Sequence, residues 1–135
     1  MSPPRSSLGL FGMFGRSSDL RQLDAALRAV DLHPRLVPEA VKLTIVSLLK
    51  EECGHPEPPA EAYRAAAELV AYCMVGVEAF AGGNDESLAN AVEARIEAAL
   101  QAGDSLDARL LLLMLHAGTL QPSVRDRYGL ESATE

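Results

Sequence analysis

The chain has 135 residues, of which 48% are hydrophobic and only 4% aromatic, and its formal charge is −7. A chain of this length buries roughly two-thirds of its unfolded surface, so neither a metal nor a disulfide is required for folding. The acidity disfavours nucleic acid as a partner, because phosphate binding relies on clustered Lys and Arg. Much of the apolar content is Ala and Leu, which favours helices over strands.

The charge is unevenly distributed along the chain. Residues 1–50 hold seven Arg or Lys against four Asp or Glu, whereas residues 51–135 hold five against fifteen. The simplest interpretation is that the acidity keeps an apolar helical protein in solution. The opposite charges of the two segments would also steer contacts between molecules.

The cysteines and the apolar runs indicate a cellular compartment. Only two cysteines occur, Cys53 and Cys73, which is typical of a reduced, cytoplasmic protein. Cys73 falls in an apolar stripe, where a thiol is usually buried and unreactive. The apolar run over residues 110–115 is far shorter than the roughly 20 residues that span a bilayer. We therefore expect a cytoplasmic protein without a transmembrane segment.

The first 17 residues are predicted to form a flexible arm, because they are rich in proline, serine and glycine. The arm carries an apolar run from Leu8 to Phe14, with Arg5 and Arg16 on either side. Such a run suits insertion into a membrane surface or a partner groove, and a loose chain terminus is the simpler interpretation.

Two helices are predicted next. The first begins at a serine cap, Ser17 or Ser18, and its apolar residues recur at helical spacing as far as Val30. The second begins at Pro38, because proline is favoured in the first turn of a helix. It ends at Gly54, the residue type that most often follows the end of a helix.

A long central helix is predicted from Pro59 to Phe80. It carries no charge between Glu68 and Glu78, so it is apolar on most sides and should be surrounded by other helices. We expect this helix and the one centred on Leu112 to form the inner layer of the fold.

Two further helices are predicted on the C-terminal side of the central one. An amphipathic helix runs from a cap at Asp85 to about Ala102, and the next runs from a cap at Asp104 to Gly118. The residues of the first that are expected to face inward are Leu88, Val92, Ile96, Ala99 and Leu100.

A short last helix is expected over residues 122–129, followed by a polar tail, residues 131–135. The sequence thus predicts an all-α fold: a single compact helical bundle of about five main helices plus this short C-terminal helix. The bundle would occupy residues 18–130, after the arm of residues 1–17.

The general plan of a small, acidic, helical protein is similar to that of the tellurite-resistance TerB-like domains. The acidic metal-binding signature of that family, built around an Ala-Asp-Gly turn, is not matched by Val30-Asp31-Leu32-His33-Pro34. The resemblance therefore implies an architecture and no site residues.

Candidate metal ligands occur at Cys53 and His55, directly after Glu51 and Glu52. A zinc site usually needs four ligands at recognisable spacing, and no second Cys or His pair occurs in the sequence. We therefore predict no metal site, no cofactor and no catalytic residue.

Three glutamates are further candidates. Glu93 and Glu97 lie one turn apart on the expected outer face of their helix, where paired carboxylates can hold a cation or act as acid and base. A solvated helix surface explains them more simply. Glu78 follows an apolar stretch, and if it were buried it would need a partner such as Arg64 or Arg109.

The sequence favours a non-enzymatic interaction protein that forms a homodimer or docks on a partner protein. The mean hydropathy is +0.06, and a small domain has few places to bury so many apolar helix faces. The alternative is a domain that binds an apolar small molecule between its inner helices, or an enzyme of unidentified reaction. The residues expected to line such a pocket are Tyr72, Met74, Phe80 and Met114.

Overall fold

The computed structural model describes residues 18–130, which form helices and no strand, so the predicted all-α fold is confirmed. The predicted arm and polar tail, residues 1–17 and 131–135, lie outside the described residues. None of the helices in the described part of the chain combines the length and the apolarity that crossing a bilayer requires.

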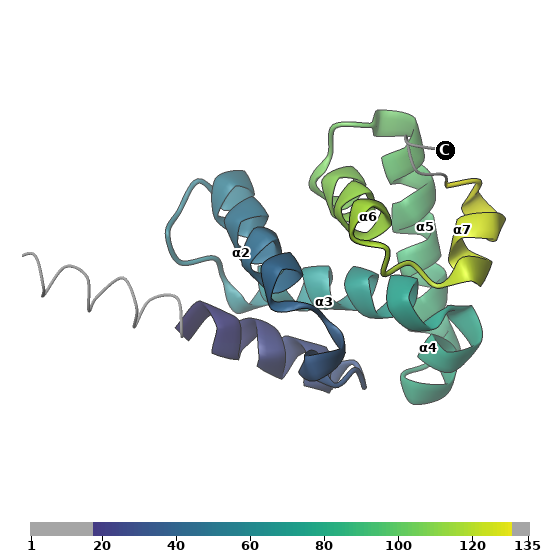
Figure 1. Cartoon of the computed structure of the whole chain (residues 1–135), viewed down its shortest axis with the longest axis horizontal. Helices are drawn as coiled ribbons and strands as arrows, with labels where there is room; N and C mark the ends of the chain where they lie inside the picture. Colours follow the sequence, from purple (N-terminus) through teal and green to yellow (C-terminus); the bar gives the residue numbers. More distant parts are fainter. Residues whose placement is uncertain (1–17, 131–135) are drawn as a thin grey trace, which may run out of the picture.

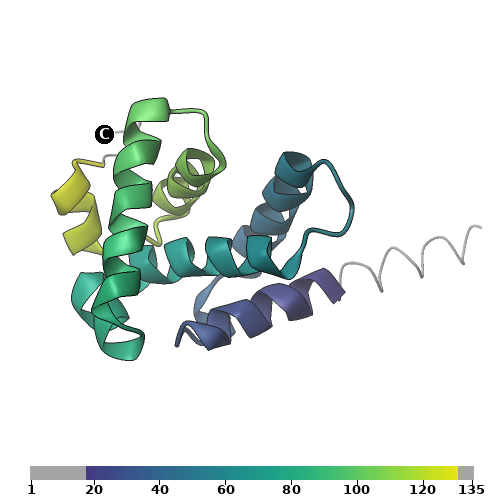
Figure 2. The ribbon, with the colours of Figure 1, turned by 180° about the vertical axis from the view of Figure 1, so that it is seen from behind.

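The helices pack around α3, which runs through the middle of the molecule (Figures 1 and 2). The helix over residues 18–29 lies along one side of α3, whereas α2 and α6 lie on the opposite side and α5 crosses its C-terminal end. The labelled elements are η1 (Pro34–Leu36), α2 (Glu39–Cys53), α3 (Ala60–Val75), α4 (Val77–Gly83), α5 (Glu86–Ala102), α6 (Leu106–Ala117) and α7 (Pro122–Tyr128).

The helix ends follow the signals in the sequence. Gly54 lies in the left-handed region with a φ of 63°, and its N–H donates to the carbonyl of Lys50, which ends α2 as predicted. Asp85 caps α5 by accepting the N–H of Leu88 at 2.6 Å. The predicted cap of α6 at Asp104 is wrong by one residue. Ser105 has the extended backbone of a cap, and its Oγ accepts the N–H of Ala108 at 3.1 Å.

The core forms where α3 meets α6, which also packs against α2 and α5. The helix centred on Leu112 lies in the inner layer with α3, as expected, with Leu110, Leu111 and Met114 buried, whereas the side chain of Leu112 itself is 49% exposed. The buried residues of α3 are Tyr63, Ala66, Ala67, Leu69, Val70, Ala71, Tyr72 and Cys73.

The predicted helix over residues 59–80 is interrupted at Gly76, which separates α3 from α4. Gly76 has a φ of 90° and a ψ of 168°, a backbone region that is essentially restricted to glycine. A Cβ at this position would lie 3.2 Å from Ser123 Oγ and 3.4 Å from Gln121 Oε1. The carbonyl of Cys73, in the last turn of α3, accepts the N–H of Gln121 at 2.8 Å, which fixes the start of α7.

Substitution of Gly76 should therefore destabilise the protein. For Gly76→Ala we expect the free energy of unfolding to fall by about 1–3 kcal/mol, because alanine at this φ and ψ is strained. Gly82→Ala is the matched control, since Gly82 is helical and no atom lies within 4 Å of an added Cβ. That variant should gain up to about 1 kcal/mol. Urea unfolding measures both, and equal effects would contradict this explanation of the break.

Candidate functional site

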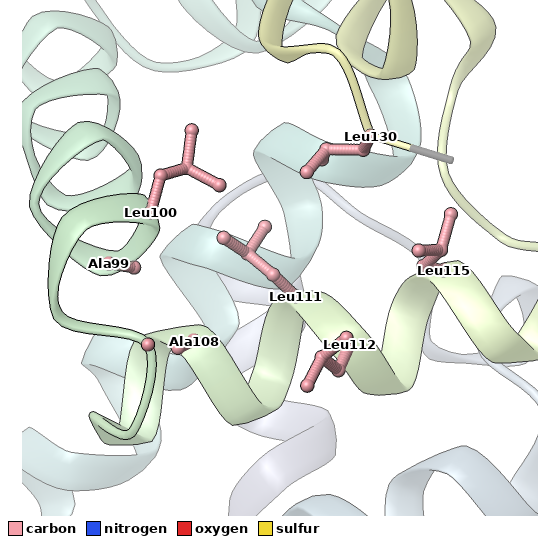
Figure 3. Close-up of a pocket in the computed structure, with 8 residues that line it drawn as sticks. Ala99, Leu100, Ala108, Leu111, Leu112, Leu115 and Leu130 are labelled. Carbon is pink, nitrogen blue, oxygen red and sulfur yellow. The ribbon is translucent and has the colours of Figure 1, made fainter. Parts of the chain in front are cut away.

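An apolar hollow of about 180 Å³ lies between α5, α6 and the residue that follows α7 (Figure 3). None of its lining side chains carries a polar atom, and five of the eight are leucines. We call this feature the leucine groove. Its lining residues are Ala99, Leu100, Gly103, Ala108, Leu111, Leu112, Leu115 and Leu130.

The leucine groove arises from the tight connection between α5 and α6. Gly103 ends α5 in the left-handed region with a φ of 79°, and Ser105 already caps α6. Two small buried residues, Ala99 on α5 and Ala108 on α6, line the groove beside this connection. Their small side chains leave the hollow unfilled, and larger leucines surround it.

The rim of the leucine groove exposes large apolar side chains. Leu111 lines the groove and is buried, whereas Leu100 is 46% and Leu112 is 49% exposed. The predicted inward position of Leu100 is therefore wrong. Within residues 18–130, one other large apolar side chain is as exposed, Leu36 in η1. Single exposed leucines are ordinary, and here two of them lie around one apolar hollow.

A second feature is a polar cluster between α3, α5 and α7. The hydroxyl of Tyr72 donates to Glu93 Oε2 at 2.7 Å, and Arg127 Nη2 lies 3.4 Å from the same oxygen. Burial and the hydrogen bond to Glu93 raise the pKa of Tyr72, so its hydroxyl stays a donor. The hydroxyl of Tyr128 belongs to this cluster and is buried without a hydrogen-bond partner among residues 18–130.

The polar cluster changes the interpretation of the candidate glutamates. Glu93 points inward with a side chain that is 14% exposed, whereas Glu97 is exposed. The predicted outward position of Glu93 is therefore wrong, and the two carboxylates do not form a pair on one surface. Glu78 is exposed and needs no buried partner, while Arg109 pairs with Glu51 at 2.8 Å.

Two further clusters hold helices together. Arg95 on α5 binds both oxygens of Asp107 on α6, at 2.8 and 3.0 Å, and lies 3.5 Å from Glu68 on α3. This arrangement satisfies one guanidinium with carboxylates from two other helices.

The other cluster surrounds Asp19, whose carboxylate is buried in the helix over residues 18–29. It pairs with Lys50 Nζ at 2.6 Å and accepts the hydroxyl of Tyr63 at 3.2 Å. Burial, followed by the charge of Asp19, raises the pKa of Tyr63 to about 12, which keeps Tyr63 a neutral donor. The cluster joins the first described helix to α2 and α3.

The two cysteines differ in exposure, and His55 makes a local hydrogen bond. Cys53 is exposed, and His55 Nδ1 accepts the backbone N–H of Glu57 at 3.0 Å. No three His, Cys, Asp or Glu side chains of residues 18–130 lie together as a metal site would require. Cys73 is buried as predicted, and burial raises its pKa to about 12, so it remains a protonated thiol.

The residues predicted to line a ligand pocket belong to the core instead. The rings of Tyr72 and Phe80 pack edge to face with centroids 5.7 Å apart, and Met114 is fully buried. None of these residues, nor Met74, lines the leucine groove. The sequence did not indicate Leu115 or Leu130, which do line it.

No protein-family model, curated protein or solved structure matches this chain. The function is therefore argued from the described residues. Each polar cluster links helices of the fold through hydrogen bonds or ion pairs. The exposed side chains of the leucine groove, by contrast, are left partly uncovered by residues 18–130. The leucine groove is the candidate functional site.

The polar cluster around Glu93 should contribute to stability. For Tyr72→Phe we expect the free energy of unfolding to fall by about 1.5–3 kcal/mol, because the partly buried carboxylate of Glu93 loses its hydroxyl donor. Tyr128→Phe is the control, and it should change stability little, since the hydroxyl removed has no partner within residues 18–130. Urea unfolding of both variants checks this, and equal losses would contradict the role given to Tyr72.

Proposed function

We propose that the protein is a non-enzymatic interaction protein that forms a homodimer through the leucine groove. The observation that supports this most directly is the exposure of Leu100 and Leu112 beside a hollow without polar groups. Removing apolar surface from water contributes roughly 25 cal/mol per Å², so covering these side chains stabilises a complex.

The chemistry of the leucine groove favours protein contact over catalysis. Acid–base and nucleophilic catalysis need a titratable or nucleophilic side chain beside the substrate, and the lining of the groove holds only aliphatic side chains and one glycine. Apolar side chains at the centre of a patch with polar residues around it are typical of protein interfaces. Exposed Glu97 and Asp104 provide such a polar border.

A second copy of the chain is the partner that the surface favours. Most soluble oligomers are symmetric assemblies of one chain, and a two-fold axis uses the same patch on both molecules. One contact of this kind covers the groove of each copy at once.

The size of the leucine groove supports one alternative, the binding of an apolar small molecule. A dry apolar cavity of roughly 150 Å³ is large enough to bind benzene, and this hollow measures about 180 Å³. A bound compound would appear in native mass spectrometry as a non-covalent mass on a monomer. That result would replace the dimer proposal with this one.

The dimer proposal predicts that a charge in the leucine groove prevents association. For Leu112→Asp we expect the dissociation constant of the dimer to rise at least about tenfold, because an aspartate in an apolar contact loses its hydration. Analytical ultracentrifugation over micromolar to millimolar concentrations measures this constant, and circular dichroism checks that the helices remain.

Leu36→Asp is the matched control, because Leu36 is 61% exposed and does not line the groove. It should leave the dissociation constant unchanged. A wild-type protein that is monomeric at every concentration, or equal effects of the two substitutions, would contradict the proposal.

A further inference from the structure

We propose that the leucine groove binds the apolar arm segment, residues 8–14, of a second copy of the chain. This inference rests on the proposed function, since it names the part of the partner copy that occupies the groove. In a symmetric dimer each copy would then give its arm segment to the other and receive one in return.

The size of the groove argues against a contact of groove with groove alone. A stable interface usually involves about 20–30 residues on each side, whereas eight residues line the leucine groove. Two arm segments, each bound to the opposite copy, add contact area without requiring a large flat surface. A segment from outside the described residues would therefore supply the contact area that the groove alone does not provide.

The chain offers two segments outside the described residues, and their chemistry separates them. Residues 131–135 read Glu-Ser-Ala-Thr-Glu, which is polar and carries two carboxylates. Residues 8–14 read Leu-Gly-Leu-Phe-Gly-Met-Phe and contain no polar side chain. A hollow lined by aliphatic side chains matches the second segment and not the first.

The side chains of the arm segment also match the groove in size. A hollow of about 180 Å³ has room for one phenyl ring, and the segment supplies Phe11 and Phe14. Gly9 and Gly12 lie next to the bulky residues and allow the backbone to come close to α5 and α6. Aromatic side chains that fill a pocket usually dominate the energy of such contacts.

The length of chain between Phe14 and Ser18 keeps Phe14 out of the groove of its own copy. Four residue steps span at most about 14 Å, and Ser18 precedes Asp19, which is fixed to Lys50 near the end of α2. The leucine groove lies between α5 and α6, and α6 separates α5 from α2 (Figure 1). Two helix-to-helix spacings amount to about 16–20 Å, more than this connection spans.

Charge supports the same pairing. The arm segment lies between Arg5 and Arg16, and no acidic residue precedes Asp19. The groove is bordered by exposed Glu97 and Asp104, three positions from Leu100 and next to Gly103. Basic flanks on the segment and an acidic border on the groove would steer the two together and weaken with salt.

The experiment uses two full-length variants. One disables the arm segment, and the other disables the leucine groove. The arm variant carries Phe11→Asp and Phe14→Asp, and the groove variant carries Leu112→Asp. Native mass spectrometry should show each variant alone as a monomer, because every arm–groove contact is broken. An equal mixture should give a heterodimer, since the arm of the groove variant still fits the groove of the arm variant.

A matched control adds the same charge to the arm without removing an apolar side chain. Ser6→Asp with Ser7→Asp should raise the dissociation constant by no more than about threefold, the effect of charge alone against the acidic border, whereas the arm variant should raise it at least about tenfold. A labelled synthetic peptide of residues 5–16 should bind the arm variant in fluorescence anisotropy. It should not bind a protein that carries the arm substitutions together with Leu112→Asp.

Other outcomes separate this inference from the proposed function. If the arm variant remains a dimer while Leu112→Asp dissociates, the inference is wrong and the groove-mediated dimer stands. If the wild type is a monomer, both are wrong. If the arm peptide binds phosphatidylserine vesicles and shows no affinity for the arm variant, the arm contacts a membrane surface and the inference is again wrong.

Discussion

The main-chain geometry at Gly76 is the constraint on which the C-terminal part of the structure depends. By ending α3 there, it leaves the carbonyl of Cys73 to bind the N–H of Gln121, and α7 begins one residue later. Val124 then enters the core, and Leu130 reaches the leucine groove as one of its walls. A side chain at position 76 would press against the same loop. One glycine therefore positions both the polar cluster and the candidate site.

The two features lie on one face of α5. Glu93 and Leu100 are seven residues apart, which returns to nearly the same side of a helix. Over the first part of this face, Arg127 of α7 contacts Glu93, and α7 ends at Tyr128 after seven residues. Beyond that point α7 no longer covers the face, which continues into the leucine groove, where Leu130 forms another wall. The groove is thus the remainder of a helix-packing surface that α7 is too short to fill.

The helices and most of their ends were predictable because their signals are local, as at Gly54, which needs only its own turn to end α2. The break at Gly76 was not, since an isolated glycine in an apolar stretch is also compatible with a continuous helix. The direction of Glu93 depends on Tyr72 and Arg127, which the sequence places far from it. The leucine run of α6 makes the helix apolar over a wide face, but which part of that face stays uncovered, at Leu112, is decided by tertiary packing.

The difference in exposure between the two cysteines provides a way to measure how often the core opens. Cys53 is exposed and Cys73 is fully buried, with a thiol that burial keeps protonated at neutral pH. An alkylating reagent reaches the first directly and the second only when α3 separates from its neighbours. The ratio of the two alkylation rates therefore reports how often the core opens, in a protein without tryptophan fluorescence.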